Sequence, residues 1–109
     1  MEKIKVLLVE DEPTLAMIIK DTLDGNEFDI TLAANGEEGL SRYAEINPDI
    51  IVADIMMPKM DGIEFCRQVK TDLRYSHIPL ILLSAKTNLH SKISGMDAGA
   101  DAYVEKPFS

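Results

Sequence analysis

The chain has 109 residues, enough for one domain of ordinary size and too few for two. Its formal net charge of -8 opposes contact with a phosphate backbone, so we expect no direct binding to DNA or RNA. No apolar run approaches the ~20 residues of a membrane-spanning helix, and the first residues show no signal-peptide pattern. A single cysteine, Cys66, excludes an internal disulfide and suits a reducing compartment, so we expect a cytoplasmic location.

The first half of the chain reads as two strands that alternate with two helices. Residues 4–9 are apolar apart from Lys5 and predict a strand. Pro13 then suits the first turn of a helix, because its missing N–H costs nothing there, and this helix ends near Asp24. Residues 28–33 predict a second strand. A second helix opens at residues 35–38, and its apolar side is formed by Leu40, Tyr43, Ala44 and Ile46.

The second half repeats this alternation. Residues 49–53 predict a strand buried on both faces, since no polar residue alternates from Ile50 to Ala53. A further strand is predicted at residues 80–83 and another at 101–105, with a helix near residues 89–98 between them. The helix that starts at Asp61-Gly62 is expected to face inward with Ile63, Cys66, Val69 and Leu73.

Five strands that alternate with four helices predict an α/β fold with a doubly wound parallel sheet. The strands at 4–9, 49–53 and 80–83 are apolar at successive positions, so both sheet faces need a cover that four helices do not supply. Ser109 suits the N-cap of a fifth helix, and we expect that the domain, residues 1–109, is truncated before it. An uncovered strip of a few hundred Å2 costs on the order of 5–10 kcal/mol at ~25 cal/mol per Å2. We therefore expect self-association or another molecule to cover it, or the fold to rearrange.

Polar residues capable of chemistry stand at the carboxyl ends of four predicted strands. Glu10 and Asp11 follow the first, Asp54 follows the third, Ser84 follows the fourth, and Lys106 follows the fifth. Because carboxyl ends of parallel strands open on one edge, we expect these side chains to converge. Each alone could be a helix cap, a turn residue or a surface residue, but their joint placement favours a site.

Three close carboxylates repel one another unless a cation lies between them. Oxygen ligands suit Mg2+, and neither His77 nor His90 is placed to make a zinc site. A metal and Lys106 would reverse the local charge and admit a phosphoryl group, to which Ser84 could hydrogen-bond. Since a carboxylate nucleophile needs no base, Asp54 could form an acyl phosphate.

At these residues the chain resembles a response-regulator receiver domain of two-component signalling. The resemblance covers the whole length and rests on four motifs in order, and the stretch 84–109 also resembles receivers attached to hybrid sensor kinases. It implies the flavodoxin-like strand order 2-1-3-4-5. The four motifs are Leu7-Leu8-Val9-Glu10-Asp11-Glu12-Pro13, Asp54-Ile55-Met56-Met57-Pro58-Lys59-Met60-Asp61-Gly62, Leu83-Ser84-Ala85-Lys86 and Gly99-Ala100-Asp101-Ala102-Tyr103-Val104-Glu105-Lys106-Pro107-Phe108.

The resemblance implies that Asp54 accepts a phosphoryl group from the phosphohistidine of a histidine kinase. It implies that Asp11, Asp54 and the backbone carbonyl of Met56 bind Mg2+, with Glu10 acting through a metal-bound water. Lys106 would contact the phosphoryl group.

The resemblance also implies a cis bond between Lys106 and Pro107 and a switch formed by Ser84 and Tyr103. The surface expected to change spans the fourth helix, the fifth strand and the fifth helix. The domain would catalyse only its own phosphorylation and dephosphorylation. Met56 and Lys86 occupy positions that influence water attack on the acyl phosphate in this family.

Three other functions compete with a phosphorylated switch. A Mg2+-dependent phosphohydrolase with an aspartyl nucleophile would need a second acid two residues after Asp54, where Met56 stands. A flavin-binding module would need a phosphate-binding loop after the first strand, where Glu10-Asp11-Glu12 would repel phosphate. A receiver could also act as an unphosphorylated interaction module, which the complete acidic set disfavours.

Overall fold

The computed structural model describes residues 2–25, 27–57, 59–84 and 89–105, in which five strands alternate with four helices. The strands are β1 (Ile4–Val9), β2 (Phe28–Ala33), β3 (Ile50–Asp54), β4 (Leu80–Ser84) and β5 (Ala102–Glu105). The helices are α1 (Pro13–Leu23), α2 (Gly36–Ile46), α3 (Gly62–Thr71) and α4 (Leu89–Asp97).

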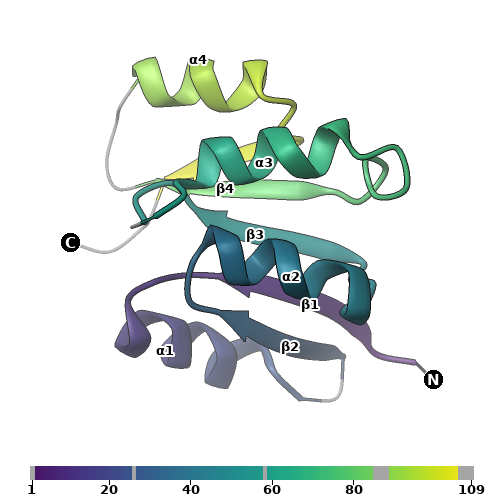
Figure 1. Ribbon diagram of the computed structural model, residues 1–109. Helices are drawn as coiled ribbons and strands as arrows, with labels where there is room; N and C mark the ends of the chain where they lie inside the picture. The colour runs from purple at the N-terminus through teal and green to yellow at the C-terminus, as the bar shows by residue number, and fades with distance from the viewer. Residues whose placement is uncertain (1, 26, 58, 85–88, 106–109) are drawn as a thin grey trace.

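The five strands form one parallel sheet in the order β2-β1-β3-β4-β5, which confirms the predicted flavodoxin-like fold. Helices α2, α3 and α4 lie in front of the sheet in Figure 1, and α1 lies behind it. Val9 of β1 is paired with Ala53 of β3, and Asp54 is paired with Leu83 of β4. This register brings the carboxyl ends of three strands to one edge of the sheet.

The larger hydrophobic core lies between the sheet and the α2, α3 and α4 layer. Phe65 of α3 is completely buried against sheet residues such as Leu7 and Leu80. Cys66 lies in the same core, and burial raises the pKa of its thiol to about 11. This confirms that Cys66 is a core residue. A smaller core beneath α1 comprises Val6, Leu8 and Ile30, with Ile19, Phe28, Leu32 and Val52 packed against it.

Side chains cap the helices near the predicted starting points. Asn35 accepts a hydrogen bond from the N–H of Glu38 at 2.9 Å, and Asp61 accepts one from Glu64 at 2.8 Å. Pro13 is the first residue of α1, as predicted. These bonds satisfy N–H groups that have no partner within the helix, so local sequence is enough to place the helix starts.

The prediction that Leu73 faces inward is wrong, because α3 ends at Thr71 and Leu73 is 90% exposed. Asp72 stops the helix: its carboxylate accepts the N–H of Arg74 at 3.1 Å, and its carbonyl accepts that of Tyr75 at 2.9 Å. Ala44, expected on the apolar side of α2, is also exposed. For both helices, the helical spacing of apolar residues therefore predicts a larger buried side than the structure has.

The two faces of β4 differ in burial. Leu80 and Leu82 are completely buried on the α3 and α4 side, whereas Ile81 and Leu83 on the α1 side are only partly buried. Val104 of β5 is on the same side as Leu83 and is 45% exposed. Within the described residues, α1 is the only helix on this face, and it packs on β2. Ser109 and the expected fifth helix lie outside the described residues.

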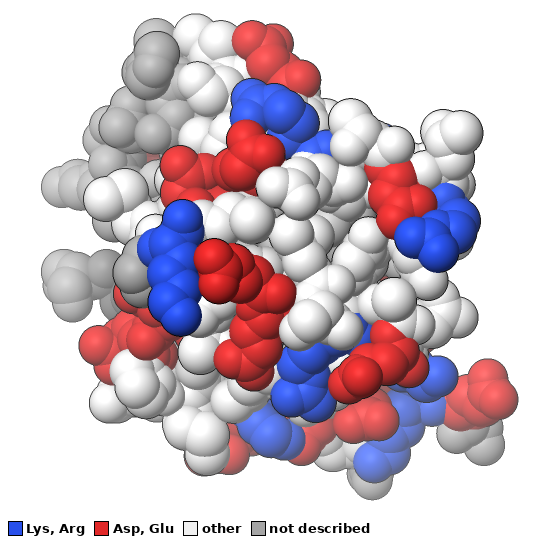
Figure 2. All heavy atoms as spheres, in the orientation of Figure 1, with Lys and Arg blue, Asp and Glu red and all other residues white. Residues whose placement is uncertain are grey.

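The surface of the α2 and α3 side mixes both signs of charge. Figure 2 shows Lys and Arg side chains interspersed with Asp and Glu rather than gathered in one basic area. Ion pairs form between oppositely charged side chains of one helix. Arg67 lies 2.9 Å from Glu64 in α3, and Arg42 lies 3.8 Å from Glu38 in α2. In the described part of the chain, no helix is long and apolar enough to cross a membrane.

Candidate phosphoryl-acceptor site

Glu10 and Asp11 form the turn from β1 into α1. The N–H of Glu10 donates to the carbonyl of Ala33 at 3.0 Å, so β2 holds the backbone at this point. The side chain of Glu10 is buried and accepts a hydrogen bond from the N–H of Glu12 at 3.3 Å. Asp11, the next residue, is exposed. The turn therefore carries one carboxylate inside the molecule and one at its surface.

Asp54 is the last residue of β3, and its side chain is also buried. The next residue, Ile55, donates its N–H to the carbonyl of Leu83 at 2.9 Å, which continues the pairing of β3 with β4. The sheet therefore fixes the backbone on both sides of Asp54. A carboxylate held in this way has little freedom to move away from its neighbours.

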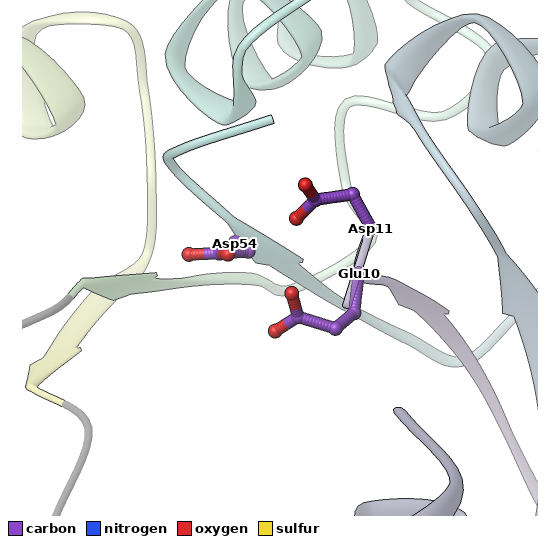
Figure 3. Close-up of side chains that lie close together, drawn as sticks. All are labelled: Glu10, Asp11 and Asp54. Atoms are coloured by element: carbon purple, nitrogen blue, oxygen red, sulfur yellow. The ribbon is translucent and has the colours of Figure 1, made fainter. Parts of the chain in front are cut away.

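The carboxylates of Glu10, Asp11 and Asp54 converge at this edge of the sheet (Figure 3). One oxygen from each lies within 4.8 Å of the other two. We call these three residues the acidic cluster. Three negative charges at this separation repel one another, which a cation would relieve. Carboxylate oxygens are the donors that Mg2+ prefers, so the donor chemistry of the cluster fits that ion.

Ser84 lies at the same sheet edge, as predicted. It is the last residue of β4, is buried, and follows Leu83, the residue paired with Asp54. Tyr103 is paired with Leu82 and is partly buried against the larger core on the α4 side. The two predicted switch residues therefore come from neighbouring strands.

Not every predicted site residue is described. Lys106, Lys86 and the bond between Lys106 and Pro107 lie outside the described residues, so their predicted roles stay predictions. Met56 is described and comes two residues after Asp54, with its side chain 72% exposed. Its predicted carbonyl contact with Mg2+ stays a prediction.

A pocket of about 220 Å3 opens beside the acidic cluster. Glu10 and Asp11 form part of its wall, so the pocket adjoins two of the three residues of the acidic cluster. No sequence pattern predicts this pocket, because its walls come from two helices and two strand ends. The other lining residues are Pro13, Ala16, Met17, Leu32, Ala33, Ala34 and Glu38.

Gly62 is a residue whose part in the site was missed from the sequence. In the sequence, Gly62 marks the start of a helix and ends the second motif, and neither feature predicts a part in the site. In the structure, a Cβ atom at this position would overlap the backbone carbonyl oxygen of Asp54. The available signal was a glycine in the first turn of a helix, where alanine is the better helix former.

Comparison with known proteins gives one consistent family. The family model described as the response regulator receiver domain matches residues 6–109. A probable transcriptional regulator, ycf27 of Porphyridium aerugineum, is 38% identical over 109 residues, which are 100% of this chain and 44% of that protein. Histidine kinase P4 of Formosa agariphila is 39% identical over 99% of this chain, but this stretch is 8% of that kinase. The chain thus spans less than half the length of either relative.

Solved structures agree with this result. The chemotaxis protein CheY4 of Vibrio cholerae superposes with a TM-score of 0.91 at 30% identity, over 99% of this chain and 90% of that one. Its similarity therefore covers the sheet, the helices and the edge that carries the acidic cluster. The relatives include both response regulators and a histidine kinase. The chain belongs to the response regulator receiver domain family of two-component signalling.

Proposed function

We propose that Asp54 accepts a phosphoryl group from the phosphohistidine of a histidine kinase, in a Mg2+-dependent reaction. The observation that carries this proposal is the acidic cluster, in which one oxygen of each carboxylate lies within 4.8 Å of the others. Two of these side chains, Glu10 and Asp54, are buried. Burying carboxylates together is unfavourable without a cation. A cation-binding site therefore explains the arrangement better than a chance grouping of acidic residues does.

Mg2+ would be held by Asp11, Asp54 and the backbone carbonyl of Met56, with Glu10 contributing through a metal-bound water. When bound, the ion would offset the charge of the cluster and of an incoming phosphoryl group. Without that compensation, the domain's net charge of -8 opposes the approach of a phosphate.

In the transfer, a carboxylate oxygen of Asp54 bonds to phosphorus while the bond from phosphorus to the histidine nitrogen breaks. The electron pair of the broken bond stays with the imidazole, and the product is an acyl phosphate on Asp54. A carboxylate nucleophile carries no proton that must be removed, so Asp54 needs no general base. Lys106 would contact the phosphoryl oxygens, and Ser84 would donate a hydrogen bond to one of them.

The phosphorylated state would be signalled through Ser84 and Tyr103. Helix α4 packs closely over this region: a Cβ at Gly95 would lie 2.7 Å from Leu82 and 3.7 Å from the ring of Tyr103. An inward rotation of the Tyr103 side chain would therefore change its contact with α4. This contact supports the surface of α4 and β5 as the part that partners detect.

The domain would catalyse only its own phosphorylation and dephosphorylation. The partner that this chemistry requires is a histidine kinase, and a cytoplasmic location agrees with the single, reduced cysteine. Direct nucleic-acid binding is disfavoured by the charge of -8. We also propose that the partly exposed α1-side face of β4 and β5 supports self-association.

Intact-mass measurement after incubation with acetyl phosphate and Mg2+ tests the proposal. We expect a gain of one phosphoryl group in the natural chain and none in Asp54→Asn or in the presence of EDTA. Asp61→Asn is a matched control, because Asp61 caps α3 outside the acidic cluster, and it should gain the group normally. A folded sample that gains nothing would favour an unphosphorylated interaction module.

A further inference from the structure

Gly62 lies at the first position of α3 and is buried. Its backbone adopts no left-handed conformation, so any residue could adopt its dihedral angles. Helix propensity alone would favour alanine over glycine here. The reason for glycine must therefore be space rather than backbone conformation.

The space that Gly62 leaves open is filled by the backbone of the phosphoryl-acceptor residue. A Cβ at Gly62 would overlap the carbonyl oxygen of Asp54, and it would lie 2.8 Å from the carbonyl carbon of Asp54 and 2.9 Å from the Cα of Ile55. All three are backbone atoms, which cannot rotate away as the end of a long side chain can. The first turn of α3 thus rests directly on the peptide that follows Asp54.

This peptide is held from the opposite side as well. Ile55 donates its N–H to Leu83 of β4 at 2.9 Å and accepts the N–H of Gly62 at 2.9 Å. The bond between Gly62 and Ile55 also closes the loop that begins with Met56, whose carbonyl is a proposed Mg2+ contact. A side chain at Gly62 would have to move either α3 or the peptide between Asp54 and Ile55.

We propose that Gly62 is a positioning residue for the phosphoryl-acceptor site, because its missing side chain lets α3 fix the backbone of Asp54 and the start of the Met56 loop. This inference rests on the proposed function of Asp54. Mg2+ tolerates little departure from octahedral geometry, and small displacements of reacting groups slow reactions strongly. A displaced Asp54 would therefore weaken Mg2+ binding and slow phosphorylation without removing any ligand.

Gly62→Ala tests the inference, with Gly39→Ala as its matched control. A Cβ at Gly39 would also be crowded, 2.8 Å from Phe65 and 3.1 Å from Val9, but by side chains and not by the backbone of Asp54. Both variants should lower the free energy of unfolding. Only Gly62→Ala should also weaken Mg2+ binding, by about tenfold or more, the range found when groups that orient metal ligands are removed.

The measurements are Mg2+ titration of the folded protein by amide NMR shifts and the rate of phosphorylation by acetyl phosphate. If Gly62→Ala is partly unfolded, a stabilising osmolyte restores the folded fraction before titration. Wild-type Mg2+ affinity and rate in Gly62→Ala would overturn the inference, and so would equal losses in both variants or failure of Gly62→Ala to fold in osmolyte. A natural chain that neither binds Mg2+ nor gains a phosphoryl group would instead contradict the proposed function itself.

Discussion

Among single residues, Met56 is well placed to influence how long an acyl phosphate on Asp54 survives. Its side chain is 72% exposed beside the site, and a thioether cannot orient a water molecule by strong hydrogen bonding. We expect Met56→Asn to speed hydrolysis several-fold, which is well below the ~100-fold that a positioned general base contributes. Decay of the phosphorylated intact mass over time measures this, and an unchanged half-life would contradict it.

The acidic residues could be predicted from the sequence because strand ends in a parallel sheet open on one edge. Glu10, Asp54 and Ser84 each end or directly follow an apolar run, and Asp11 comes next after Glu10. The structure brings one oxygen of each of the three acids within 4.8 Å of the others. Gly62 could not be predicted, since its role depends on a contact between α3 and the backbone of β3. No periodic pattern of apolar residues in the sequence indicates such a contact.

At the level of whole elements, a polar network joins the carboxyl ends of α2 and α3. Tyr43 donates its hydroxyl to Asp72 at 2.8 Å, and Arg74 donates to the same carboxylate at 3.1 Å. These bonds, first from Arg74 and then from Tyr43, lower the pKa of Asp72 to about 2. Burial, and then the contact with Asp72, raises the pKa of Tyr43 to about 12.

The network gives the joint between α2 and α3 a defined pH dependence. Because the folded-state pKa of Asp72 lies below its ordinary value of about 4, the ionised group stabilises the fold above that pH. This contribution is lost as the pH falls from about 4 to about 2. Urea unfolding of the natural chain and Asp72→Asn across this range should show a difference that shrinks toward acid. A difference independent of pH would contradict this assignment.

Helix starts were predictable where capping residues mark them, whereas the end of α3 was missed because the apolar spacing continues past the helix into a turn. Asn35 and Asp61 cap helices that begin close to where the sequence predicts. Leu73 continued the apolar spacing of α3, but the hydrogen bonds of Asp72 end that helix first. The strand order came from the family resemblance, because alternation alone predicts a parallel sheet without ordering its strands.

For the molecule as a whole, the α1-side face of β4 and β5 is an apolar surface that no helix of the described residues covers. Val104 is 45% exposed there, beside partly buried Ile81 and Leu83. We expect the chain to self-associate through this face, so its sedimentation coefficient should rise with concentration. Val104→Lys should reduce that rise, whereas Leu73→Lys, a control at a residue 90% exposed elsewhere, should not. Concentration-independent sedimentation of the natural chain would contradict this expectation.

The central claim is that Asp54, held with Glu10 and Asp11 in one acidic cluster, carries the phosphoryl group. Borohydride reduction is the most direct test, because it converts an acyl phosphate on an aspartate into homoserine. After treatment with acetyl phosphate and Mg2+, followed by borohydride and peptide mass analysis, we predict homoserine at position 54 alone. An acyl phosphate on Glu10 would instead be reduced to 2-amino-5-hydroxypentanoic acid. That product at position 10, homoserine at position 11, or no reduced residue at any of the three positions in a folded and phosphorylated sample would contradict the account.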